Sequence, residues 1–150
     1  MTTTAIILSS LALVLSMASL AWQGWTWVRS GPVLRVELSN FLTDAASVPG
    51  EGLRNFLQVT VINRGRAATT IVAWGIERPG GSSMVAVHSE RFSDRLPARV
   101  EPHASLTVFT PAESVRAFSE RHGAPYSSLR VWARPAAGKP VYAKKSIPLD

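Results

Sequence analysis

No Asp, Glu, Lys, Arg or His occurs in residues 1–28. Within that stretch, Ala5–Leu20 consists of Ala, Ile, Leu, Val, Met and Ser alone. An α-helix rises about 1.5 Å per residue, so a helix from Thr4 to about Trp25 covers the roughly 30 Å hydrocarbon layer of a bilayer. The sequence therefore predicts a transmembrane helix with a short amino end in residues 1–30, followed by a separate domain in residues 31–150.

Three tryptophans, Trp22, Trp25 and Trp27, cluster at the end of this helix, and Arg29 follows them. Indole rings settle at the headgroup level, and arginine side chains extend to lipid phosphates. We expect these four residues to anchor the helix. The alternative is a cleaved signal peptide, with Ser19-Leu20-Ala21 as its cleavage site. A signal peptide normally begins with a basic segment and has a shorter apolar run, so a retained anchor is favoured.

The cations nearest the helix, Arg29 and Arg35, both follow it, and none precedes it. The positive-inside rule counts such residues and places their side of the helix in the cytoplasm. On this small count we expect residues 31–150 to be cytoplasmic.

Small or polar residues recur along one face of the predicted helix at spacings of 4, 3, 4, 3 and 4. They are Ala5, Ser9, Ala12, Ser16, Ser19 and Gln23. A heptad seam of this kind allows close approach of a second helix and hydrogen bonds across the contact. It favours self-association, or docking on another membrane protein. The alternative is that Ser and Ala are simply common in such helices.

Beyond residue 33 the apolar residues alternate with polar ones, the period of half-buried strands. Turn residues such as those of Asn63–Arg66 and Pro79–Gly81 separate the alternating runs. We expect seven strands, at residues 34–39, 57–61, 69–77, 84–88, 105–109, 129–134 and 141–147.

One helix is predicted within the domain. Thr110 suits the N-cap, Pro111 suits the first helical position, and Glu113 completes a capping box. The helix should run to about His122 with Gly123 as its C′ residue, and Val115 and Phe118 should face the core.

The fold class can be predicted from three features: seven strands, a short helix between the fifth and the sixth, and Trp74 as a candidate buried tryptophan. It is mainly β, an immunoglobulin-like seven-stranded β-sandwich behind the transmembrane helix. The domain has enough residues for one core of this size.

The residues that catalysis and metal binding require are sparse. There is no cysteine, so a disulfide, a thiolate metal site and a cysteine nucleophile are excluded. None of His88, His103 and His122 has a second ligand at metal-binding spacing, and His88 with Glu90 is the nearest approach. No nucleophile elbow, P-loop or dinucleotide-binding motif occurs. We expect a non-enzymatic protein without a cofactor.

Basic residues are the remaining candidates for binding, within a net charge of +6. Five of them predict a cationic hairpin near the end of the chain: Arg130, Arg134, Lys139, Lys144 and Lys145. Trp132 should lie on the Arg130 face of this hairpin and Tyr142 on the Lys144 face. Such a hairpin could bind phosphate on lipid or nucleic acid, and nucleic acid is the poorer candidate because no dense basic stripe occurs. The alternative is a solvated sheet face whose cations discourage edge pairing.

A second candidate surface for a partner combines two loop segments, residues 43–54 and 89–99. Long loops at the end of a sandwich are common binding sites.

Three parts of the chain resemble a known group of proteins: the leader running into W-x-W-x-R-S-G-P, the segment Val61–Ile71 and the segment Leu96–Ser105. It comprises small uncharacterised single-pass membrane proteins of actinobacteria and their phages, with an immunoglobulin-like domain. Leu96–Ser105 also resembles a turn of bacterial immunoglobulin-like domains, with His103 where glycine is usual; histidine is among the residues that tolerate a left-handed backbone. The resemblance implies the immunoglobulin-like fold and the membrane anchoring, and it implies nothing about chemical activity.

Three functions follow as hypotheses. The first is a membrane-anchored interaction or scaffolding module that presents its sandwich to a protein partner or forms homo-oligomers through its helix. The second is a phage structural protein, or one that interacts with the host membrane. The third is an anionic-lipid-binding domain that uses the cationic hairpin.

Overall fold

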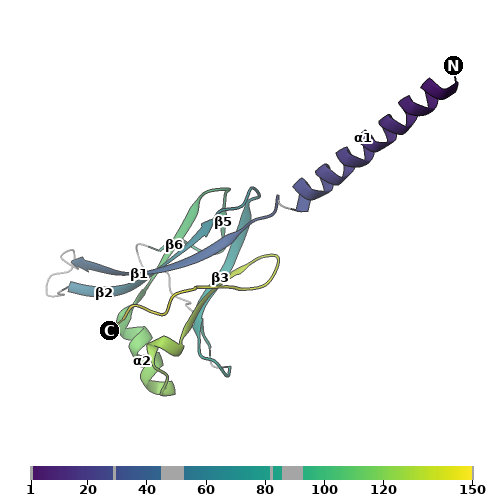
Figure 1. Cartoon of the computed structure of the whole chain (residues 1–150). Helices are drawn as coiled ribbons and strands as arrows, with labels where there is room; N and C mark the ends of the chain where they lie inside the picture. Colours follow the sequence, from purple (N-terminus) through teal and green to yellow (C-terminus); the bar gives the residue numbers. More distant parts are fainter. Residues whose placement is uncertain (1, 29, 45–52, 82, 86–92, 150) are drawn as a thin grey trace. The chain divides into compact units, whose positions relative to one another are not determined.

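The computed structural model describes residues 2–28, 30–44, 53–81, 83–85 and 93–149. The chain divides into two compact units, Met1–Gly31 and Pro32–Asp150. The first unit is helix α1, Thr2–Val28 (Figure 1). Its segment Thr3–Trp27 is long and apolar enough to cross a membrane, the one such helix among the described residues. Each large apolar side chain from Ile6 to Trp27 is 55–79% exposed, so α1 buries none of them within the chain.

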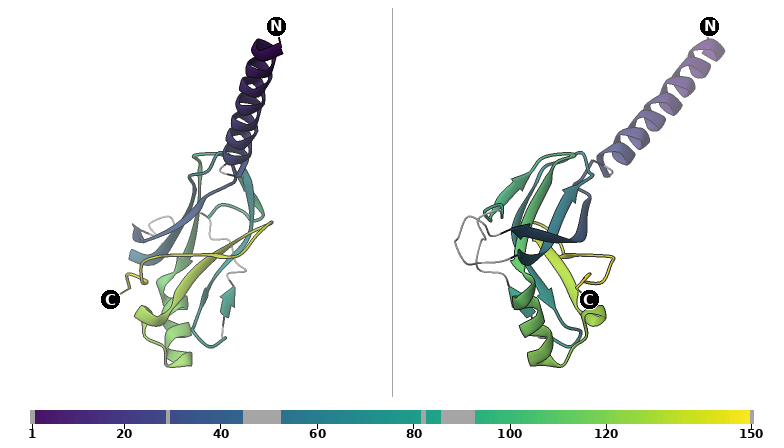
Figure 2. Two further views of the ribbon diagram at one scale, coloured as in Figure 1. Left: turned by 45° about the vertical axis from the view of Figure 1, so that its right-hand side comes forward. Right: turned by 90° about the vertical axis from the view of Figure 1, so that its left-hand side faces the viewer.

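The second unit contains two antiparallel sheets (Figure 2). The three-stranded sheet has the order β1-β2-β6 and consists of β1 (Leu34–Asp44), β2 (Leu53–Asn63) and β6 (Ser105–Pro111). The five-stranded sheet has the order β4-β3-β7-β8, with β5 also paired to β3. Its strands are β3 (Thr69–Glu77), β4 (Ser83–Val85), β5 (Ala98–Val100), β7 (Arg130–Pro135) and β8 (Val141–Tyr142). The domain is therefore mainly β, as predicted.

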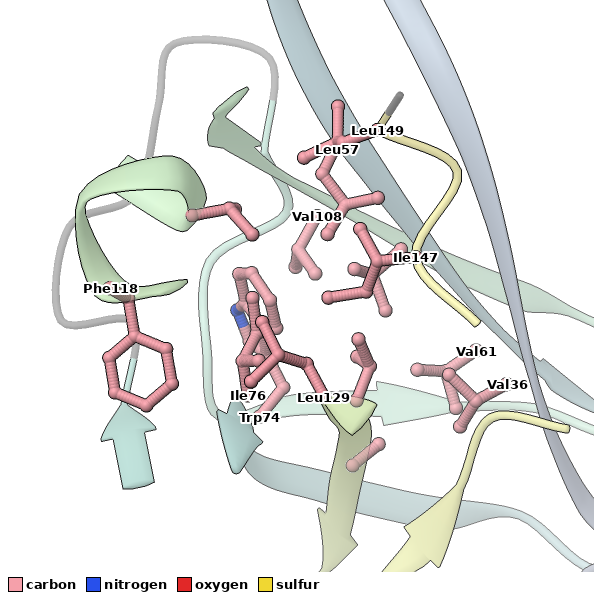
Figure 3. Packing of buried hydrophobic residues seen from close by; sticks show 14 of the residues in the cluster. Val36, Leu57, Val61, Trp74, Ile76, Val108, Phe118, Leu129, Ile147 and Leu149 are labelled. Atoms are coloured by element: carbon pink, nitrogen blue, oxygen red, sulfur yellow. The ribbon is translucent and has the colours of Figure 1, made fainter. Parts of the chain in front are cut away.

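One hydrophobic core joins the two sheets. Alternate side chains of β2 point into it, and in β3 an irregularity between Ile71 and Ala73 shifts the alternation. Leu57, Val59 and Val61 of β2 are fully buried, as are Ile71 and Ile76 of β3. The predicted buried tryptophan, Trp74, is 4% exposed and packs in this cluster (Figure 3).

The segment after β8 leaves the sheet and completes the core. Only Val141–Tyr142 pairs with β7, so the strand predicted over 141–147 is too long. Ile147 and Leu149 are buried in the core instead, and Figure 3 shows them beside Leu57 and Val108. The side-chain amide of Asn40 on β1 donates a hydrogen bond to the carbonyl oxygen of Pro148. Burial of two apolar side chains between the sheets replaces the edge pairing that the alternating pattern predicted.

Helix α2 (Ala112–His122) lies between β6 and β7 and begins without the predicted capping box. Thr110 remains in β6, paired with Leu57 and buried, and Pro111 stands at the cap position with no side-chain cap hydrogen bond. Sheet pairing of Thr110 therefore outweighs its value as a cap. The other end is as predicted: Gly123 adopts a left-handed φ of 57°, and its N–H donates to the carbonyl oxygen of Glu120 at 3.1 Å.

The strand count and lengths also differ from the prediction. The described residues form eight strands, because the three-residue β5 is too short for alternation to reveal. Strands β1 and β2 have 11 residues each, since they pair with each other along their whole length. β3 has the predicted bounds. Of the strand predicted over 84–88, residues 86–88 lie outside the described residues.

Asn63, fully buried at the end of β2, connects three segments. Its Nδ2 donates to the carbonyl oxygens of Ala67 at 2.8 Å and Val100 at 3.2 Å, and its Oδ1 accepts from the N–H of Gly65 at 3.0 Å. Its backbone carbonyl accepts from His103, whose φ of 63° is the left-handed conformation predicted for it. One amide side chain thus holds the β2–β3 turn against β5.

Candidate functional site

The predicted seam lies on one face of α1, because residues spaced three and four apart share a face of a continuous helix. The hydroxyls of Ser9 and Ser16 each donate to the carbonyl oxygen four residues earlier, at 2.7 and 2.8 Å. Nε2 of Gln23 donates to the hydroxyl oxygen of Ser19 at 3.3 Å. The hydroxyl hydrogens of Ser9 and Ser16 are thus used inside the helix, so these two residues offer small side chains and free oxygen lone pairs to a neighbouring helix.

The predicted membrane-anchoring tryptophans are prominent on α1: Trp22, Trp25 and Trp27 are 70, 58 and 79% exposed. Arg29, the fourth predicted anchoring residue, lies outside the described residues. Ser30 follows, and its N–H and hydroxyl both donate to the carbonyl oxygen of Trp27, at 3.1 and 2.6 Å.

The cationic hairpin is formed by β7 and β8, and its register decides which side chains share a face. Trp132 pairs with Tyr142 on β8 and with Gly75 on β3. Arg130 and Arg134 lie two residues on either side of Trp132, so all four side chains belong to the face of the five-stranded sheet that points away from the core.

Trp132 is buried although it lies on this outer face, with 5% exposure. Its indole ring lies against Gly75, which has no side chain to displace it. The guanidinium carbon of Arg134 stands 5.2 Å from the ring centroid, a cation–π distance. Nε1 of Trp132 is the one buried side-chain polar atom among the described residues that has no hydrogen-bond partner. The pairing of Trp132 with Gly75 explains this burial, and it is visible only in the register of β3 and β7.

Tyr142 is 41% exposed and hydrogen-bonds to Glu77. Partial burial is the main cause that raises the pKa of Tyr142, and the hydrogen bond and negative charge of Glu77 raise it further. The positive charges of Arg130 and Arg134 act in the opposite direction.

Lys144 and Lys145 lie at a bend after β8, both exposed, with a hollow on each side of them. On one side they lie with Arg130 and Tyr142. On the other they lie with Arg35 and Glu37 of β1, where the Glu37 carboxylate is 3.0 Å from Nε of Arg35 and 3.9 Å from a guanidinium nitrogen of Arg64.

The structure therefore brings together three of the five predicted cations, Arg130, Lys144 and Lys145. Arg134 lies over Trp132 instead, and Lys139 is exposed in the turn between β7 and β8.

The remaining candidates are the histidines and the two predicted loop segments. No group of three or more His, Asp or Glu side chains able to hold a metal occurs in the part of the chain that the structure describes. The ring of His122 packs on Phe118 with centroids 4.6 Å apart. His88 and Glu90 lie outside the described residues, as do residues 45–52 and 89–92 of the predicted loop surface.

Comparison with protein-family models and with curated proteins finds no match. A solved structure, described as the X-ray structure of Northeast Structural Genomics Consortium target SoR45, aligns with 73% of this chain and 80% of its own chain. The TM-score is 0.33 and the sequence identity is 14%.

Proposed function

We propose that the protein is a non-enzymatic, membrane-anchored interaction module. Residues 1–30 span the bilayer, and the β domain is presented to a protein partner or to further copies on the cytoplasmic side.

One observation carries this proposal. Over 27 residues α1 exposes every described large apolar side chain, including three tryptophans at one end. A contiguous apolar surface of this extent is unstable in water and requires lipid or another protein to cover it. At about 1.5 Å per residue, 27 residues reach about 40 Å, enough for the hydrocarbon layer and part of the headgroup region.

We also propose that the β domain is immunoglobulin-like. In chain order, the sheets β1-β2-β6 and β4-β3-β7-β8 correspond to strands A-B-E and C′-C-F-G of that fold. Trp74 on β3 corresponds to the buried tryptophan of strand C. The pairing of β5 with β3 departs from the pattern. An NMR structure with contacts from β1 to β2 and from β3 to β7 would support the assignment, and other strand neighbours would refute it.

Membrane extraction tests the anchor. The full chain should stay in the membrane fraction through high salt and alkaline carbonate, leave it only in detergent, and have the intact mass from Met1. Leu13→Arg puts a charge at the centre of the helix, which costs insertion about 2.5–3.5 kcal/mol, and should release the protein. Ser30→Arg adds the same charge outside the apolar segment and should not. A soluble product that begins after Ala21 would mean a cleaved signal peptide and would refute the anchor.

Labelling tests the side of the domain. The chain has no cysteine, so Ala137→Cys in the exposed β7–β8 turn provides a single thiol. A membrane-impermeant maleimide should label it in inverted vesicles and not in intact cells. Labelling in intact cells would place the domain outside and leave the anchor itself unaffected.

A further inference from the structure

Lys144 and Lys145 lie on a short segment that is fixed at both ends. Before them, the N–H of Ala143, one residue past the end of β8, donates to the carbonyl oxygen of Val131 at 2.8 Å. After them, Ile147 and Leu149 are buried in the core. The backbone of the two lysines is therefore held while their side chains reach solvent. A pre-organised backbone reduces the conformational entropy that binding costs.

These lysines share a hollow of about 290 Å³ with Arg130 of β7. The hydroxyl-bearing residues Ser127, Tyr142 and Ser146 line the same hollow. The three cations come from two separate segments of the chain, so the hollow depends on the tertiary structure and not on one basic run in the sequence. Three cationic residues and three hydroxyl-bearing residues therefore line one concave site.

No carboxylate lines this hollow. Glu77 lies opposite Arg130 in the β3–β7 register and hydrogen-bonds to Tyr142. Glu37 lies in the hollow on the other side of the two lysines. Arg35, Arg64 and Arg99 form ion pairs, and none of the ion pairs in the described part of the chain involves Arg130 or the two lysines. The positive charge at the hollow is therefore not neutralised by an ion pair within the described part of the chain.

We propose that this hollow binds a phosphate group. We call it the phosphate hollow and define it by Arg130, Lys144, Lys145, Ser127, Tyr142 and Ser146. Phosphate is a compact anion with several acceptor oxygens, and a guanidinium can donate two parallel hydrogen bonds to it. The hydroxyls of Ser127 and Ser146 can donate to the oxygens that the cations leave unpaired. The phosphate belongs to a phospholipid headgroup or to a free phosphate compound, and the binding chemistry is the same for both.

This site goes beyond the proposed anchoring and does not depend on it, since free phosphate would bind whichever side of the membrane the domain occupies. It also differs from the cationic hairpin as a whole. Arg134 and Lys139 have no place in it.

Two titrations of the full chain test the proposal, with the backbone amides of Ala143, Lys144, Lys145 and Ser146 followed by NMR. In uncharged detergent, inorganic phosphate is added at constant ionic strength against chloride. In phosphate-free buffer, nanodiscs of phosphatidylcholine are compared with discs that also contain phosphatidylglycerol. Lys144→Gln/Lys145→Gln should weaken binding of the responding probe at least tenfold. Lys139→Gln/Arg116→Gln removes two exposed cations outside the hollow and should leave binding within twofold of the unaltered protein.

A response to inorganic phosphate alone supports a free phosphate compound as the ligand, and a response confined to phosphatidylglycerol discs supports a lipid headgroup. Failure of both probes to shift these amides would overturn the site. A Lys144→Gln/Lys145→Gln protein that responds like the unaltered one would overturn it as well.

Discussion

Trp132 lies so close to Gly75 on the neighbouring strand that a Cβ atom added at Gly75 would stand 2.9 Å from Cζ2 of the indole. The same atom would stand 2.5 Å from the backbone carbonyl oxygen of Met84. Strands β4 and β7 therefore approach β3 closely at this point because β3 has a glycine there. The absence of a side chain lets a tryptophan be buried on the outer face of a sheet.

Gly75→Ala should consequently destabilise the domain by about 1–3 kcal/mol, the usual cost of overpacking against atoms that cannot retreat. The free energy of unfolding by urea, followed by near-ultraviolet circular dichroism of the full chain in detergent, measures this. Gly31→Ala is the matched control, because nothing lies within 4 Å of a Cβ there. Equal stability of the two variants would show that β4 and Trp132 are free to shift.

Asn63→Ala should cost about 1–3 kcal/mol, because it leaves the buried backbone groups of Gly65 and Val100 and the partly buried carbonyl of Ala67 without their partner. Hydrogen exchange should rise at the β2–β3 turn and at β5 together. Asn55→Ala on the exposed part of the same strand is the control, with an expected change within about 0.5 kcal/mol. Faster exchange at the turn but not at β5 would contradict the connecting role of Asn63.

Ile147→Ala should lower the free energy of unfolding by about 2–5 kcal/mol, as for other buried aliphatic truncations. It should also weaken phosphate binding, although no charge is removed, because the segment carrying the two lysines loses an attachment. Ser146→Ala, at an exposed neighbour, should leave the stability unchanged. Normal stability of Ile147→Ala would mean that the segment does not complete the core.

The titration of Tyr142 provides a test of its surroundings. Its pKa in the folded protein is raised by partial burial and by Glu77. The neutral phenol therefore stabilises the fold below a pH of about 10, and this contribution is lost as the pH rises through the folded pKa. In Tyr126→Phe, Tyr142 is the only tyrosine, and its absorbance at 295 nm should titrate at higher pH in the folded chain than in guanidinium. Adding Glu77→Gln should lower the midpoint without abolishing the difference, and an unchanged midpoint would exclude Glu77 as a cause.

Ser16→Leu/Ser19→Leu should abolish association of the full chain in a membrane two-hybrid assay, because bulky side chains would separate the helices. Ser10→Leu/Ala18→Leu makes the same kind of change away from the seam and should preserve association. If both double variants associate like the unaltered chain, the seam is not the contact.

Features that depend on local residues were predictable. The apolar helix, strand 69–77, the left-handed Gly123 and the buried Val115 and Phe118 each follow from periodicity or from the backbone preference of one residue. The prediction that Thr110 caps the helix was wrong. Its neighbours in the sequence favour a cap, and only its pairing with β2 keeps it in a strand.

The candidate site was predictable only in part. The five cations were identified from the sequence, but their division into Arg134 on Trp132 and three residues around a hollow depends on contacts between distant segments. The burial of Trp132 likewise requires Gly75, which is far away in the sequence and adjacent only through the β3–β7 register.

The position of Leu149 in the core has a consequence for biosynthesis. Synthesis proceeds at about 5–20 residues per second, so roughly 6–23 s separate the appearance of Val36 from that of Leu149 in the same core. During this interval α1 has already left the ribosome, and the two sheets still lack the residues that close the space between them. We expect the anchor to enter the bilayer before the domain can complete its fold. Every nascent copy would then complete its fold while it is already tethered to the bilayer.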